Sequence, residues 1–156
     1  MKKLFWYIGV IGCILFFATA CGEPKVQEES KNEITEKTLT YEGRNENWSA
    51  LLVVDVDIIT SPEGEPFFQE KRYTERFELT YLGELSDLKH IKKLEFSYEP
   101  HSGTGKSGYT FDRPPTEKTF VHSSGGGGAI PLEEEKIPVF VKVDDEAEES
   151  FVIQKP

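Results

Sequence analysis

Hydrophobic and polar positions divide the chain into three parts. An uncharged apolar run extends from Leu4 to Phe17, a polar and charged stretch from Gly22 to Lys37, and an alternating pattern from Thr38 onward. The apolar run is shorter than the roughly 20 residues that a membrane-spanning helix needs. Two lysines precede it and small residues follow it, so the run predicts a secretory signal peptide. Adding the next three residues brings the string close to spanning length, and an uncleaved N-terminal anchor remains the alternative.

The part from Thr38 onward alternates apolar and polar residues with the period of two that is typical of β-strands. In its clearest stretch, Leu52, Val54 and Val56 share one face of a strand. Only Glu84–Lys93 has near-helical spacing, enough for a short turn. The alternation predicts strands at Leu39–Glu42, Leu51–Ile58, Phe67–Leu82, Leu94–Glu99, Lys118–His122, Ile137–Val143 and Ser150–Gln154.

Turn signals separate these strands, and no long helix interrupts them. Consecutive strands of this kind predict an all-β fold, an antiparallel β-sandwich of about seven strands. An immunoglobulin-like arrangement is one candidate, although the cysteine pair of that family is missing.

A cysteine marks the end of the apolar leader. The residues Ala18-Thr19-Ala20-Cys21-Gly22 resemble the bacterial lipobox, with Ala18 where leucine is commonest. The resemblance implies cleavage after Ala20 and attachment of diacylglycerol and fatty acids such as palmitate to Cys21. Two or three acyl chains anchor a protein stably, whereas one chain is marginal. A plain signal peptide is the alternative.

The composition of the mature chain limits the classes of partner that it can bind. Cleavage after Ala20 removes two of the 18 basic residues and none of the 28 acidic ones, which leaves a net charge of −12. This balance argues against nucleic acid, because binding to phosphates requires cationic side chains. Cys13 is lost with the leader and Cys21 carries the lipid, so the domain has neither a disulfide nor a thiol site. The remaining length suits one domain.

The predicted organisation therefore has three segments. Residues 1–20 form the lipoprotein signal peptide, residues 21–37 form a lipidated cysteine with a flexible tether, and residues 38–156 form the β-sandwich domain. The tether prediction depends on the almost complete lack of apolar residues after Cys21.

Two glycine-rich segments were candidates for ligand binding. Gly103–Ser107 matches the end of a phosphate-binding loop, but Pro100 stands where that motif needs a glycine and no helix follows. A hairpin loop is favoured there. Ser123–Gly128 reads SSGGGG and predicts either a partner-contact loop or anion nest, or a flexible crossover, of which the crossover is favoured.

The three histidines offer no convincing catalytic pattern. If the strand ending near Pro100 pairs with Glu117–His122, His101 and His122 lie about 17 Å apart, at about 3.4 Å per residue, and cannot share a proton or a metal. His90 would lie nearer His122, but no nucleophile motif accompanies them. Surface positions are the prediction for all three, and no catalytic residue is assigned.

Two acidic clusters, Glu133–Glu135 and Asp144–Glu149, could hold calcium weakly outside a cell. The second lacks the glycine that calcium loops use, and solvated turns are favoured over metal sites for both. We therefore predict no metal or cofactor. Trp48 is a possible partner contact, but packing in the core is favoured for it.

Several segments resemble small uncharacterised lipoproteins of Bacillus-type Gram-positive bacteria. They are Tyr41–Gly43 with Asn47-Trp48, Tyr81–Gly83 before Leu94–Tyr98, and Gly125–Pro131 before Ile137–Val143. The resemblance implies export, lipidation and a β domain, and it supplies no catalytic residue.

The sequence thus predicts a lipid-anchored protein on the extracytoplasmic face of the cell membrane. Its predicted role is that of a non-enzymatic binding module with an unknown protein or envelope partner and no nucleic acid. A cell-envelope hydrolase and a weakly calcium-responsive surface domain are the alternatives.

Overall fold

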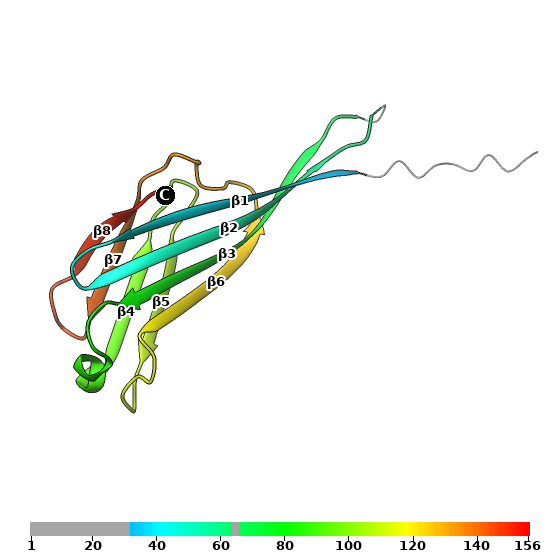
Figure 1. Ribbon diagram of the computed structural model, residues 1–156. Helices are drawn as coiled ribbons and strands as arrows, with labels where there is room; N and C mark the ends of the chain where they lie inside the picture. Colours follow the sequence, from blue (N-terminus) through cyan, green and yellow to red (C-terminus); the bar gives the residue numbers. More distant parts are fainter. Residues whose placement is uncertain (1–31, 64–65) are drawn as a thin grey trace, which may run out of the picture.

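The computed structural model describes residues 32–63 and 66–156. Two antiparallel four-stranded sheets pack face to face, so the fold is an all-β sandwich (Figure 1). The long sheet has the order β1-β2-β3-β6, formed by β1 (Glu33–Arg44), β2 (Trp48–Thr60), β3 (Gln69–Tyr81) and β6 (Thr119–Gly127). The short sheet has the order β5-β4-β7-β8, formed by β5 (Gly105–Thr110), β4 (Lys93–Tyr98), β7 (Ile137–Val143) and β8 (Glu149–Ile153).

The core lies between the sheets and follows the predicted alternation. Leu52, Val54 and Val56 of β2 are at most 1 % exposed, while the residues between them face away from the short sheet. Aromatic rings fill the centre, where Phe77 of β3 stacks on Tyr98 of β4 with ring centroids 4.4 Å apart. No charged or polar residue is buried among the described residues. Apolar packing therefore joins the sheets without a disulfide.

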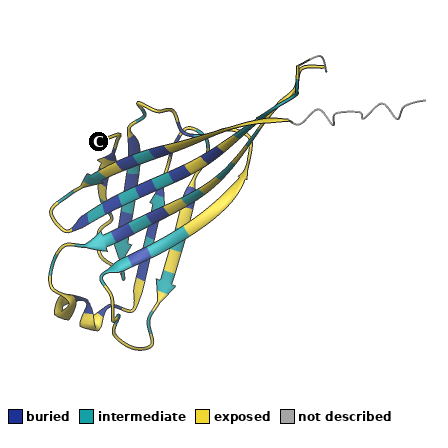
Figure 2. Cartoon of the chain, turned by 45° about the vertical axis from the view of Figure 1, so that its right-hand side comes forward, coloured by how far each residue is buried: buried dark blue, intermediate teal, exposed yellow. Residues whose placement is uncertain are grey.

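The long sheet extends past the short one. Its first three strands have 12 or 13 residues, whereas the strands of the short sheet have five to seven. Beyond Val56 the alternation of buried and exposed residues fades, and the β2–β3 hairpin projects from the sandwich (Figures 1 and 2). β1 begins at the same end of the molecule, because Glu33 is opposite Thr60 of β2.

The predicted all-β sandwich is confirmed, and several elements differ from the prediction in their bounds. The sandwich has eight strands where about seven were predicted, because Gly105–Thr110 forms β5 where a loop was predicted. β1 begins at Glu33, so the last five residues of the predicted tether belong to the domain. The helical segment is a single 3-10 helix, η1 (Leu85–His90). The chain also stays in one sheet for its first three strands, unlike the immunoglobulin order.

The pairing assumed for the histidine geometry was also wrong. β4, which ends near Pro100, pairs with β5 and β7, whereas His122 lies on β6, which pairs with β3 in the other sheet. The two histidines therefore belong to different sheets and not to the two ends of one hairpin.

Candidate functional site

Both edge strands of the long sheet contain a long exposed stretch. The stretch in β1, Glu33–Thr38, carries charged residues, whereas the stretch in β6 carries none. Ser123–Gly127 continues β6 through five exposed residues, and the first two are serines and the last three glycines (Figure 2). The glycine run predicted as a crossover is thus an edge strand. At the other edge of the sheet, β1 is joined to the C-terminal segment by two hydrogen bonds between Glu42 and Gln154, at 2.8 and 3.0 Å.

The hydrogen-bond pattern fixes which backbone groups of β6 point outward. In an antiparallel pair, residues that exchange hydrogen bonds alternate with residues whose N–H and C=O point away from the partner. Gly128 donates to the carbonyl of Lys71 at 3.1 Å, which places the even-numbered residues of β6 in the bonded set. The N–H and C=O groups of Ser123, Gly125 and Gly127 therefore point away from β3, toward solvent.

At Val121, the preceding outward-facing residue of β6, both backbone groups have hydrogen-bond partners. The hydroxyl of Tyr109 on β5 donates to the carbonyl of Val121 at 2.6 Å and accepts from its N–H at 3.1 Å. Further along β6, no other strand in the described part of the chain pairs with this edge. The three outward residues beyond Val121 thus present an open row of donors and acceptors.

The outer face of the long sheet is hollowed beside this edge. A shallow depression is lined by Asp55 and Asp57 of β2, by Arg72 and Thr74 of β3, and by Gly125–Gly127. The guanidinium of Arg72 is 62 % exposed and pairs with Glu70 at 2.7 Å. Because glycine has no side chain, the depression continues to the open backbone.

A buried tyrosine of the short sheet is connected to the β6 edge through hydrogen bonds. The hydroxyl of Tyr98, on the short sheet, donates to Glu75 of β3 at 2.6 Å, and the hydroxyl of Ser124 on β6 donates to the same carboxylate oxygen at 2.6 Å. Burial, followed by the hydrogen bond to Glu75, raises the pKa of Tyr98 well above its ordinary value. This chain of contacts links both sheets to the edge strand.

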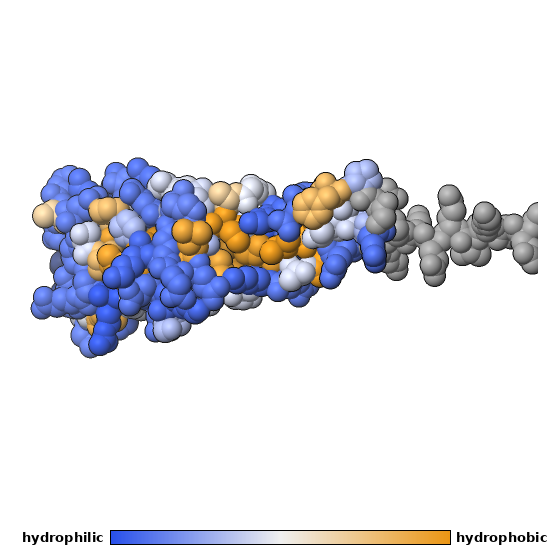
Figure 3. All heavy atoms as spheres, turned by 90° about the horizontal axis from the view of Figure 1, so that it is seen from above, coloured by the Kyte–Doolittle hydropathy of each residue, from blue (hydrophilic) through white to orange (hydrophobic). Residues whose placement is uncertain are grey.

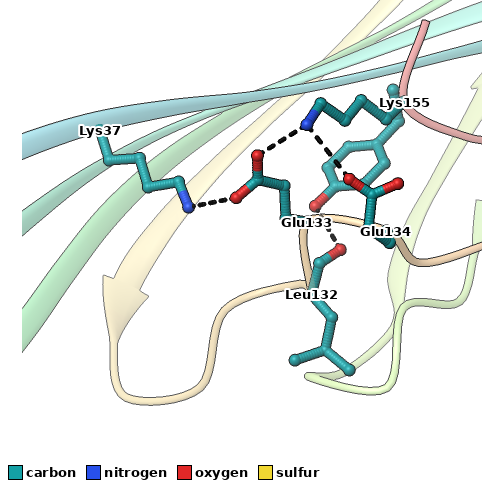
Figure 4. Close-up of polar contacts among 6 residues, drawn as sticks. Lys37, Leu132, Glu133, Glu134 and Lys155 are labelled. Carbon is teal, nitrogen blue, oxygen red and sulfur yellow. Dashed lines mark hydrogen bonds and ion pairs between the residues drawn. The ribbon is translucent and has the colours of Figure 1, made fainter.

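The first acidic cluster lies in the crossover loop, Gly128–Lys136, which connects β6 to β7 across the two sheets. Glu133 accepts hydrogen bonds from the ammonium groups of Lys37 and Lys155, each at 2.7 Å (Figure 4). Lys155 also reaches Glu134 at 3.1 Å. The hydrogen bonds from Lys155 and Lys37 lower the pKa of Glu133 to about 2, because they stabilise its ionised form. The cluster thus fastens the loop to β1 and to the C-terminus.

Two further contacts hold the same loop. Glu135 accepts from the backbone N–H of His101 at 2.6 Å and of Leu132 at 3.0 Å, and it lies 2.8 Å from the ring Nδ1 of His101. Although partial burial raises the pKa of Glu135, these hydrogen bonds lower it overall. The hydroxyl of Tyr41 donates to the carbonyl of Leu132 at 2.8 Å, and burial, followed by the nearby glutamates, raises the pKa of Tyr41 to about 12.

The second acidic cluster forms the turn between β7 and β8. Asp144 has a φ of 47°, a left-handed conformation that aspartate tolerates better than most residues. Its Oδ1 accepts from the backbone N–H groups of Lys92 and Lys93 at 2.8 and 2.6 Å. Glu149 accepts from the side-chain amides of Asn45 and Asn47. Among residues 32–63 and 66–156, no three His, Cys, Asp or Glu side chains converge on a possible metal position.

The other residues singled out from the sequence occupy different environments. Trp48 packs in the core, as favoured, and is not exposed for the possible partner contact. It is 1 % exposed and packs on Tyr81 and Phe120, with ring centroids 5.1 and 6.4 Å away. His90 and His101 are exposed, and His122 is half-buried with its ring 6.3 Å from that of Tyr98. Ala20 and Cys21 lie outside the described residues.

Comparison with known proteins supplies no further assignment. No family model, curated protein or solved structure matches the chain. No helix in the described segments is long and apolar enough to cross a membrane. The class of the protein is therefore that of its fold, an all-β sandwich in which the outer edge of β6 is unpaired along Ser123–Gly127.

Proposed function

We propose that this protein is a lipoprotein, anchored by Cys21 to the extracytoplasmic face of the cell membrane, that binds an extended segment of a partner by strand addition to β6. The observation that carries the binding proposal is the open row of backbone groups at Ser123, Gly125 and Gly127. An extended peptide that adds to a sheet edge gains main-chain hydrogen bonds there, and side chains in nearby hollows give specificity.

The glycines themselves support this role. Glycine in a strand interior lowers strand stability, and it commonly marks a place where another backbone approaches closely. Exposed edges are ordinarily protected by prolines, charged side chains or bulges, since an open edge invites pairing. Thr119–Gly127 contains neither a proline nor a charged residue apart from the ionisable His122. The composition of β6 thus leaves the edge accessible.

The magnitudes indicate what the partner must supply. Three outward residues offer six backbone groups, and net contributions of about 0.5–1.5 kcal/mol each would give about 3–9 kcal/mol in total. Association costs roughly 4–15 kcal/mol in translational and rotational freedom. Backbone pairing alone therefore gives weak binding, and a stable complex needs partner side chains in the hollow beside Arg72.

The anchor is tested on the protein from the membrane fraction. Mass spectrometry should find the chain beginning at Cys21 with acyl chains attached, and Cys21→Ser should retain the leader and lose the acyl mass. A wild-type product that keeps residues 1–20, or that carries no lipid, would contradict the anchoring proposal.

The edge is tested with two variants at one position. Ser123→Pro removes an outward N–H without touching the hydrogen bonds between β6 and β3, and Ser123→Ala removes only the hydroxyl. The probe is a displayed library of random extended peptides, from which binders to the wild-type domain are selected. We expect Ser123→Pro to weaken binding by up to about tenfold, the equivalent of one lost hydrogen bond of about 1.4 kcal/mol, and Ser123→Ala to leave it unchanged.

Amide hydrogen exchange provides the second measurement. The N–H groups of Ser123, Gly125 and Gly127 should become protected when a selected peptide binds. Equal affinity of all three proteins, or protection at other residues only, would contradict strand addition at β6.

A further inference from the structure

We infer that Phe67 and Phe68, beside the turn of the β2–β3 hairpin, enter the lipid surface and orient the anchored domain. The inference rests on the lipid anchor proposed above. The observation behind it is the exposure of these two consecutive phenylalanines, whose side chains do not pack in the core of the sandwich.

The side chains at this end are unusually exposed for their type. Phe67 is 79 % exposed and Phe68 43 %, and Ile34 at the start of β1 is 60 % exposed. The hairpin ladder continues as far as Phe68, because the N–H of Ser61 donates to its carbonyl at 3.1 Å. Figure 3 shows apolar surface at this projecting end of the molecule. The fold thus holds two phenylalanines away from its own core.

The position of the tip follows from where β1 begins. Glu33 is opposite Thr60, so the chain enters the domain at the end where the hairpin projects (Figure 1). The residues from Cys21 to Asn32 number twelve. Twelve residues span at most about 40 Å, at about 3.3 Å per residue. The tip therefore lies within easy reach of a lipid surface that holds Cys21.

The opposite end of the domain lies much farther away. The 13 residues of β2 span about 43 Å at 3.3 Å per residue. Leu82 and Leu85, at that far end, are 41 % and 37 % exposed. They match the phenylalanines as exposed apolar residues but do not share their position relative to Cys21, so they provide an internal control.

Charged residues limit how deep the tip can enter. Glu63 is exposed at the turn of the hairpin, Glu70, Lys71 and Arg72 follow the phenylalanines after Gln69, and Glu33 and Asp57 lie nearby in the sheet. Desolvating these charges is costly, whereas phenylalanine favours the boundary between headgroups and acyl chains. Only the phenylalanine side chains are therefore expected to enter, with Glu63 held at the headgroups and the rest of the acidic domain above the surface.

The experiment uses the full lipidated protein in phosphatidylcholine vesicles. Glu63→Cys places an environment-sensitive fluorophore at the hairpin tip, and Ser86→Cys places it at the far end. Vesicles that carry a nitroxide on the lipid acyl chain quench only a fluorophore that reaches them. We expect quenching at position 63 to exceed that at position 86 several-fold.

A pair of variants assigns the effect to the phenylalanines. Phe67→Ser with Phe68→Ser should abolish quenching at position 63, while Leu82→Ser with Leu85→Ser should leave it unchanged. Protein that sediments with vesicles but shows equal quenching at both labels, or quenching that survives loss of the phenylalanines, overturns the inference and leaves the anchor standing. Protein that does not sediment with vesicles overturns the anchor and the inference together.

Discussion

We predict that the hydrogen bond between Tyr98 and Glu75, which joins the two sheets next to β6, contributes measurably to the stability of the domain. Tyr98→Phe removes a hydroxyl that donates to the Glu75 carboxylate at 2.6 Å, while the phenyl ring keeps its stacking on Phe77. The side chain of Tyr98 is completely buried. The expected loss of stability therefore comes from the hydrogen bond and not from a cavity.

The magnitude follows from the partners of the carboxylate. A hydrogen bond to a charged group contributes about 1.5–3 kcal/mol. Glu75 is only half-buried and keeps its second hydrogen bond, from Ser124, so the lower part of this range applies. We expect the free energy of unfolding to fall by about 1–2 kcal/mol. For a domain of this size the melting temperature should fall by roughly 4–8 °C.

Urea denaturation followed by Trp48 fluorescence measures the change, because Trp48 is buried and is the sole tryptophan of residues 21–156. Tyr73→Phe is the matched control, since its hydroxyl has no hydrogen-bond partner in the described part of the chain. Glu75→Gln and the double variant with Tyr98→Phe complete a cycle that should show a coupling energy of about 1 kcal/mol. Additive single effects, or equal loss in Tyr98→Phe and Tyr73→Phe, would refute the reasoning.

Three other predictions concern packing and pH. A Cβ at Gly105 would overlap the ring of Tyr98, so Gly105→Ala should destabilise the domain by about 1–3 kcal/mol in urea denaturation, while Gly108→Ala, with room for a Cβ, should have less effect. The folded-state pKa of Glu133 is lowered to about 2, so the stability it contributes is present above its ordinary value of 4.5 and is lost as the pH falls toward 2. Glu133→Gln should flatten that acid limb of the stability curve, and an unchanged limb would contradict the role of the lysine pair. The pKa of Tyr41 is raised to about 12, so the folded state binds this proton more tightly and stability should fall as the pH rises from 10 toward 12. Tyr41→Phe should reduce that alkaline loss, as measured by thermal melting across this range.

The alternation of residue types was sufficient to predict most of the strands. Period-two patterns in β2 and β7 correspond to residues that face the core, because one face of each strand must be buried. β5 was missed since its glycines at positions 105 and 108 resemble loop composition. Glycine is needed at position 105 because the ring of Tyr98, on the neighbouring strand, occupies the space of a Cβ. The pattern of residue types around position 105 does not reveal this contact.

The same limit applies to the candidate site. Ser123–Gly128 was recognised as unusual, but its pattern favoured a crossover over an edge strand. Whether a glycine run forms a strand depends on pairing with β3, which lies about 50 residues earlier in the chain. The sequence likewise contained no sign that Lys37 and Lys155 pair with Glu133 of the acidic triplet, because both lysines are distant from it along the chain.

By itself, the sequence determined the all-β class and which face of each strong strand is buried, while the leader with its cysteine stays a prediction. These properties depend on hydrophobic burial and on residues close together in the chain. Only the tertiary structure decided which strands pair, that the glycine run lies at an edge, and that Phe67 and Phe68 project at the end where β1 begins. Those outcomes depend on contacts between residues that are distant along the chain. The local pattern of residue types carries no information about the energies of such contacts.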